Sequence, residues 1–423
     1  MRWYDRRDGR PWPGWLVRLW CGTAVLGIGA SLWAFWLTYD DARDRAASER
    51  EIAAACGGLV SGEDVMDLRG GMVRAKPDDL RLDPESRLPG LCRIYRVPEP
   101  GHTDELFTLL VRTSSDGRPL HHVGDDVAME PFDYRLHEKD VTRRADHPEG
   151  RPLGDGSLGI HGDGFVTVRA ECTNGRSDGD IPQLLRVTAR AQYDEVSDGD
   201  RSRLAAIAHR ATAGAAAEIG CVTRLHDLPA SLAPVGATLR AADTADASCA
   251  WYGRYIARTG QGRLPDRMLE VPTTPRSAEE PCLLAMSPDR VHTVRWSGPE
   301  DAQKYGDSAL THSPWWIRAV SYFGPDTASV GYDDILDGDR YLKPGTAGGP
   351  RGRRDPVGLL DLRGPAGDVH PHHQLHVRRR HRRPDAGSLP GVRRRHHRAA
   401  WVHGREVPCR RGLRLGLRQT AHQ

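Results

Sequence analysis

The chain has 423 residues, of which 38% are hydrophobic, and this is enough for one to three domains. Its formal charge of +3 conceals an asymmetry, because the part from Thr346 onward holds 18 arginines, no lysine and five acidic residues, a net +13. The first 345 residues therefore carry −10. This distribution excludes a uniformly basic protein and separates an acidic body from a strongly basic tail.

Leu19–Tyr39 is an uncharged apolar run with tryptophans near both ends. About 20 helical residues cross the roughly 30 Å hydrocarbon layer, so we predict a transmembrane helix that contacts the lipid bilayer over this range. Five arginines lie within residues 1–18. The positive-inside rule then predicts a cytoplasmic N-terminus and an extracytoplasmic body from Asp40 onward.

The residues after this run favour a retained signal anchor over a cleaved signal peptide, since no small-x-small cleavage pattern follows it. Residues 40–55 are rich in alanine and in charges of both signs, and we predict a helical stalk that lifts the ectodomain from the membrane. The stalk should end at Cys56-Gly57-Gly58, a typical helix stop.

The body alternates strand-like and helix-like segments, so the predicted fold class is α+β. Five apolar runs have strand composition and are listed here as Leu91–Val97, Leu106–Val111, Phe165–Ala170, Leu184–Ala191 and Trp315–Phe323. From Asp200 the apolar residues recur at helical spacing up to Gly220-Cys221.

Two short sequence features that each contain a cysteine recur in the same order, which predicts an internal repeat. Ala55-Cys56-Gly57 and Gly220-Cys221 each follow an Ala-rich helix, and Cys92 and Cys249 each enter a predicted strand with a tyrosine three residues later. We therefore expect two ectodomain units, residues 56–220 and an incomplete second copy over residues 221–345.

The body contains six cysteines, listed as Cys56, Cys92, Cys172, Cys221, Cys249 and Cys282. An even set on the exported side of a membrane predicts disulfides, and the short spacing of a zinc site is missing from it. If the copies are equivalent, Cys56–Cys92 and Cys221–Cys249 are the expected pairs. Pairing of Cys172 with Cys221 is a competing choice.

The tail, residues 346–423, consists mainly of Arg, His, Gly and Pro. A segment like this is expected to be disordered, and it could bind polyanions. An alternative is that it is a high-GC coding sequence read out of frame. Read one base later, the codons of Gly358–Arg363 permit Ala-Ser-Ser-Thr-Cys, those of His373–Arg379 permit an alternating strand, and those of Trp401–Pro408 permit Gly-Cys-Thr-Gly-Val-Lys-Phe-Pro. We predict that the tail is out of frame and packs against nothing.

With this arrangement of anchor and cysteines, residues 15 to 345 resemble the single-pass membrane proteins of high-GC Gram-positive bacteria that have a duplicated cysteine-containing ectodomain. The resemblance implies an architecture and a location in the cell membrane. It implies no activity.

Motifs that could carry chemistry are weak. Gly154–Gly159 matches the G-x-G-x-x-G pattern, but no strand precedes it and no helix follows, so we predict a loop. Asp333–Asp339 lacks the full spacing of a calcium loop. His121, His122 and His161 are expected in surface loops. We therefore predict no catalytic, cofactor-binding or metal-binding residues and no cofactor.

These observations favour a membrane-anchored, non-enzymatic extracytoplasmic protein that binds an envelope protein or polymer or has a structural role. One alternative is an extracytoplasmic hydrolase with dispersed catalytic residues, which a concave pocket with strongly perturbed carboxylates would favour. The other is a polyanion-binding protein that uses the basic tail. Nucleic acid is not an expected native partner.

Overall fold

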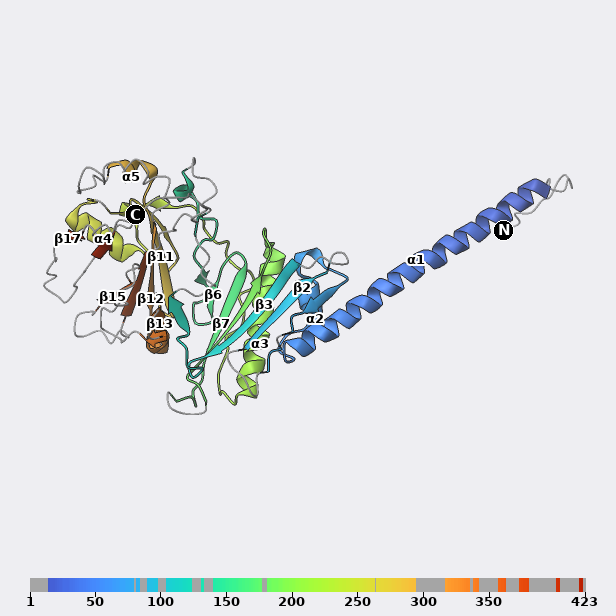
Figure 1. Cartoon of the computed structure of the whole chain (residues 1–423), viewed down its shortest axis with the longest axis horizontal. Helices are drawn as coiled ribbons and strands as arrows, with labels where there is room; N and C mark the ends of the chain where they lie inside the picture. Colours follow the sequence, from blue (N-terminus) through green and yellow to red (C-terminus); the bar gives the residue numbers. More distant parts are fainter. Residues whose placement is uncertain are drawn as a thin grey trace, which may run out of the picture.

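The structure is a computed structural model. It describes residues 14–79, 81–83, 90–97, 104–123, 131–132, 140–176, 181–262, 264–293, 316–334, 338–341, 357–362, 373–379, 401–403 and 418–420. These residues form helices and mainly antiparallel sheets, in agreement with the predicted α+β class (Figure 1).

Helix α1 (Gly14–Ala55) is one uninterrupted helix of 42 residues that projects from the rest of the molecule (Figure 1). Apolar side chains in its first half are exposed; Leu26, for example, is 74% exposed. Within the described part of the chain, α1 is the one helix long and apolar enough to cross a bilayer. The predicted span and stalk are therefore a single rod.

The end of α1 is part of the core of the body, which differs from the expected stalk that would hold the body away from the apolar span. Ile52 and Ala55 are fully buried, and the Arg45 guanidinium lies 2.5 Å from the Asp67 carboxylate. The helix ends as predicted: the Gly58 N–H donates to the Ala53 carbonyl and the Gly57 N–H to that of Ala54, the Schellman pattern.

The first sheet has seven strands in the order β1-β2-β3-β8-β7-β6-β5. Their bounds are β1 Ala75–Pro77, β2 Gly90–Arg96, β3 Asp104–Thr113, β5 Arg151–Pro152, β6 Gly159–His161, β7 Phe165–Glu171 and β8 Leu184–Ala191. Four of the predicted strands are thus confirmed as β2, β3, β7 and β8. Alternation of apolar and polar residues gives this sheet one apolar face.

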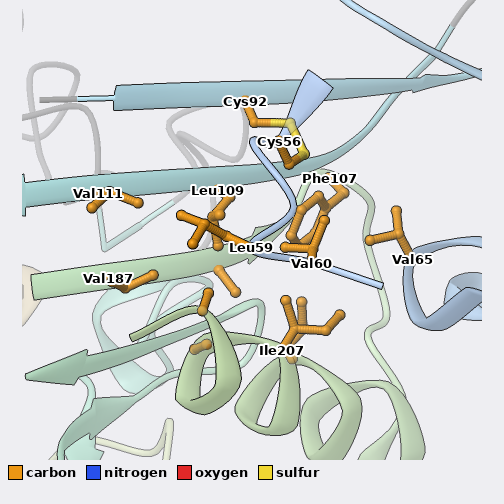
Figure 2. Close-up of a cluster of buried hydrophobic side chains, with 14 of the residues drawn as sticks. Cys56, Leu59, Val60, Val65, Cys92, Phe107, Leu109, Val111, Val187 and Ile207 are labelled. Atoms are coloured by element: carbon orange, nitrogen blue, oxygen red, sulfur yellow. A yellow bond between two sulfur atoms is a disulfide. The ribbon is translucent and has the colours of Figure 1, made fainter. Parts of the chain in front are cut away.

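Helix α3 (Asp198–Glu218) covers that apolar face and confirms the predicted helix. The Ser197 hydroxyl caps it by accepting the Asp200 N–H. Figure 2 shows the resulting core, in which Ile207 of α3 points toward Val60 and toward Phe107 of β3.

The second sheet has the order β15-β16-β12-β11-β10-β9. Its strands in the body are β9 Arg240–Ala241, β10 Arg267–Glu270, β11 Glu279–Ala285 and β12 Trp316–Tyr322, the last of which confirms the predicted aromatic strand. Helix α4 (Ala250–Thr259) covers one face of it, with Tyr252 and Ile256 against Cys282 and Leu284.

The strand predicted to begin at Cys249 is wrong, because this segment forms α4. Cys249, Tyr252 and Ile256 are all buried, and their spacing of three and four residues matches one face of a helix. Only the short similarity to the segment around Cys92 had favoured a strand.

The two units interlock. Strand β4 (His121–Val123), which follows β3 of the first sheet, pairs in parallel with β13 (Val330–Asp334), and β13 pairs with β14 (Gly338–Tyr341). Phe132 and Ala145 pack on Leu283 of the second sheet. Segments that precede the expected boundary at residue 220 therefore contribute to the core beside the second sheet and to a separate three-stranded sheet, β14-β13-β4. The remaining short helices are α2 Gly62–Met66, η1 Leu68–Gly70, η3 Val141–Arg143, η4 Ala242–Thr244, α5 Pro288–Thr293 and η5 Gly324–Ser329.

Four segments of the tail are described as strands: β15 Val357–Leu362, β16 His373–Arg379, β17 Trp401–His403 and β18 Arg418–Thr420. Strand β16 pairs with β12 from Ile317 to Tyr322, and β15 pairs with β16. For β15 and β16 this differs from the expectation of a tail that packs against nothing, because the edge of β12 offers unpaired backbone groups.

The six body cysteines form three disulfides, Cys56–Cys92, Cys172–Cys221 and Cys249–Cys282. The first pair was predicted. The predicted Cys221–Cys249 pair is wrong, because the packing of α3 on β7 and β8 brings Cys221 to Cys172, and α4 places Cys249 beside β11. Cys282 is therefore paired. Cys21 is an exposed free thiol, and Cys409 lies outside the described residues.

Candidate functional site

The two sheets face each other across a cavity of about 140 Å³. The first sheet contributes residues of β3, β7 and β8 that point away from α3, and the second contributes residues of β11 and β12 that point away from α4. The lining is apolar at Leu110, Leu120, Ile160, Phe165, Pro281 and Val320, and charged at Arg112, His121, Glu149, Arg186, Glu279 and Arg318. The layers thus run from α3 through the two sheets to α4, with a charged space in the middle.

Strand alternation explains how charged groups come to lie here. In β8, Val187 and Ala189 pack on α3, so Arg186 and Thr188 must point to the opposite face. That face would be solvated in a single-sheet domain. In this protein it is covered by β11, where Glu279 points to the cavity.

His121 is at the centre of a hydrogen-bond network between the units. Its Nε2 lies 2.7 Å from Asp326 Oδ1, and an Arg186 N–H contacts its Nδ1. Because a guanidinium can only donate, Nδ1 is the acceptor and Nε2–H donates to Asp326. The ring of Tyr322 lies against the imidazole, with centroids 4.3 Å apart.

Three ion pairs join the units around this histidine. Arg186 donates to Glu279 at 2.9 Å, and Arg169 lies 2.6 Å from Asp326. Farther along, Arg318 of β12 forms a bidentate pair with Glu149 at 2.7 and 2.6 Å. All three carboxylates are almost fully buried, so each depends on its guanidinium partner to remain ionised.

The pKa values reflect this pairing. Burial opposes ionisation of Glu279, but the positive charge of Arg186 outweighs it and lowers the Glu279 pKa to about 2. Burial likewise opposes ionisation of Asp326, yet His121 and Arg169 lower its pKa to about 2. Both groups are therefore fixed anions near neutral pH and are poorly suited to transfer a proton.

One carboxyl group has a raised pKa, but it lies elsewhere. Burial raises the pKa of Glu280 to about 7. Glu280 follows Glu279 in β11, so it points to the opposite face of the sheet and does not line the cavity. Both ring nitrogens of His121 are occupied, and no described serine, threonine or cysteine bonds to it. Among the described residues, His121 therefore does not form the nucleophile–base contact that is typical of a hydrolase.

The positions considered for chemistry in the sequence lie as follows. His121 and His161 are not in surface loops as expected, because they lie on buried strands and are 6% and 2% exposed. The side chain of His122 lies outside the described residues, as does Asp337 of the weak calcium pattern. In the described part of the chain, no group of three or more His, Cys, Asp or Glu side chains could hold a metal ion.

The G-x-G-x-x-G segment is a loop, as predicted, and it docks on the second unit. Gly156 has φ of 87°, and a Cβ atom there would lie 2.5 Å from Thr274 Oγ1. Thr274 donates to the Asp155 carbonyl at 2.7 Å, and Arg276 lies 2.6 Å from the Asp155 carboxylate. The glycine allows two loops to approach closely.

The residues of the network were not predicted from the sequence. Arg186 lies in a strand that was predicted from its composition, but its partner Glu279 is distant in the chain, and no short motif connects the two. Comparisons of the chain with family models, with curated proteins and with solved structures find no match.

Proposed function

We propose that the protein is a single-pass, membrane-anchored, non-enzymatic binding protein whose extracytoplasmic part takes up a small polar ligand between its two sheets. Support for the location comes from α1, which is long and apolar enough to span a bilayer, and from three disulfides, which are typical of an oxidising compartment. The arginines before the span favour export of the body.

The observation that carries the proposal is the cavity with balanced charges. Ligand sites occur preferentially at domain interfaces and combine apolar walls with a few fixed polar groups, and this cavity has both. A cavity of about 150 Å³ can hold one benzene molecule. The ligand should therefore have a single small ring or a comparable chain.

The charges indicate what kind of molecule fits. Arg186 and Arg318 are neutralised by Glu279 and Glu149, and Arg112 lies 3.2 Å from Asp116. A ligand with a net charge would bring an uncompensated charge into a buried site, which is costly. A neutral polar molecule or a zwitterion can instead exchange hydrogen bonds with both signs of charge and stack on Phe165 or Tyr322.

A thermal-shift measurement on the full chain in detergent tests this. The probes are free amino acids as zwitterions, monosaccharides as neutral molecules, and dicarboxylates and diamines as charged ones. We expect a neutral or zwitterionic probe to raise the unfolding temperature, since a ligand at 100 times its Kd stabilises by about 2.7 kcal/mol.

Val320→Phe fills the cavity without removing an ion pair and should abolish the shift. Val73→Phe makes the same change at an exposed position and should preserve it. The proposal is wrong if no probe stabilises the parent chain or if Val320→Phe responds as the parent does. A shift with the charged probes alone would contradict the ligand class.

A further inference from the structure

Five strands of the second sheet repeat the order of five strands in the first. The first sheet contains β1-β2-β3-β8-β7, and the second contains β10-β11-β12-β16-β15. Every neighbouring pair in both series is antiparallel. In both series the last strand along the chain, β8 or β16, pairs with the third strand, and the strand before it in the chain, β7 or β15, lies on its far side. Strand β16 therefore corresponds to β8, and β15 to β7.

The disulfides agree with this correspondence. Cys92 lies on β2 and Cys282 on the equivalent β11, and both face the helix-covered core of their sheet. Each is bonded to a cysteine at a helix end, Cys56 after α1 and Cys249 before α4, over separations of 36 and 33 residues. The equivalent cysteines are thus Cys56 with Cys249 and Cys92 with Cys282, which differs from the matching expected from the sequence.

The first unit has a second disulfide whose equivalent the second unit lacks. Cys172 directly follows β7, and Cys221 follows Gly220 at the end of α3. The equivalent of Cys172 should directly follow β15, which ends at Leu362, and the equivalent of Cys221 should follow a helix after β16. As translated, the chain has no cysteine at either place.

A reading frame one base later permits both cysteines. The last two bases of the Leu362 codon with the first of Arg363 can read TGC, a cysteine at the end of β15. The codons of Trp401–His403 can read GGG-TGC, the Gly-Cys pair found at Gly220-Cys221. Between them, the arginine codons at Arg393–Arg395 and Arg398 permit alanine, the commonest residue of α3.

We infer that the second unit is a duplicate of the first and that its native completion is encoded one base out of the present frame. The completed unit has a fourth disulfide, between the cysteines encoded at codons 362–363 and 402–403, as the counterpart of Cys172–Cys221. Its formation removes two protons and two electrons from the thiols. A disulfide-carrying thiol oxidase of the exported compartment accepts them and is itself reduced to a dithiol.

Two measurements test this inference independently of the ligand proposal. The first is re-sequencing of the gene from the codon of Tyr341 to that of Pro371, where we expect one base fewer than the present frame requires. An unchanged sequence there would overturn the inference.

The second measurement compares the full chain with a version in which one base is deleted between the codons of Leu342 and Val357 and translation continues to the first stop of that frame. Peptide mapping without reductant should show a fourth disulfide, and limited proteolysis should show slower cleavage beyond residue 345. A third version with serine at both new cysteine codons should lose the disulfide but keep part of the protection. Free alkylation of both new thiols, or unchanged cleavage, contradicts the inference.

Discussion

The guanidinium of Arg186 on β8 lies 2.9 Å from the carboxylate of Glu279 on β11, although the two residues are 93 positions apart in the chain. Each belongs to a different sheet, and each side chain points away from the helix that covers its own sheet. The pair is therefore a direct connection between the two units. Its energetic role can be measured apart from any ligand.

Arg186→Met should destabilise the protein by about 3–5 kcal/mol, because it leaves the buried Glu279 without its partner. The double variant Arg186→Met with Glu279→Met should recover most of this loss, since both charges are then replaced by apolar groups of similar size. Urea unfolding of the single and double variants gives the coupling energy. Arg143→Met is the control, because the Arg143 side chain is 78% exposed beside Asp140. This substitution should lower the free energy of unfolding by at most about 1 kcal/mol. A cost below about 1 kcal/mol for Arg186→Met would contradict the assigned role.

The secondary structure of the first unit was largely predictable, whereas the connection between the units was not. Strand composition located β8, and helical spacing located α3, because both depend on neighbouring residues. The choice between Cys172 and Cys249 as the partner of Cys221 depends on which helix covers which sheet. The contact between His121 and Asp326 joins residues 205 positions apart, so local patterns contain no sign of it.

His161 should make stability depend on pH. It is 2% exposed, and burial, followed by the positive charges of Arg151 and Arg201, lowers its pKa to about 4. An unfolded histidine has a pKa near 6.5. Between these values the unfolded state binds more protons than the folded state, so the free energy of unfolding falls as the pH is lowered from about 6.5 to about 4.

The expected loss over this range is on the order of 2–3 kcal/mol. His161→Gln should remove this part of the pH dependence, and His226→Gln, at an exposed position, should retain it. Unfolding by urea at a series of pH values measures both. The same slope in His161→Gln as in the parent would show that other groups are responsible.

Gly156 should be needed for the contact between the loops of the two units. Gly156→Ala combines a positive φ of 87° with a Cβ atom 2.5 Å from Thr274 Oγ1, so either the backbone or the loop around Thr274 must move. Gly154→Ala is the matched control, because its φ of 63° brings strain while its nearest atom is 3.9 Å away. We expect Gly154→Ala to lower the free energy of unfolding by about 1 kcal/mol, and Gly156→Ala to lower it by about 1–3 kcal/mol more. Hydrogen exchange at residues 274–277 should accelerate in Gly156→Ala alone; equal exchange in both variants would argue against a docking role.

The disulfides provide a test of membrane orientation. If the arginines before the span keep the N-terminus in the cytoplasm, the body is exported and its cysteines are oxidised. Replacement of Arg2, Arg6, Arg7 and Arg10 by serine should weaken this preference, so that a fraction of the molecules inserts in the opposite orientation. In those molecules the body would be in a reducing compartment.

The measurement is alkylation in denaturant without reductant, followed by peptide mapping of Cys92 and Cys282, which are bonded in the structure. We expect both to be protected in the parent and partly alkylated in the variant. Serine at Arg351, Arg353, Arg354 and Arg363 removes the same charge far from the span and should leave both protected. Free Cys92 and Cys282 in the parent would mean that the body faces the cytoplasm, and the proposed location would then be wrong.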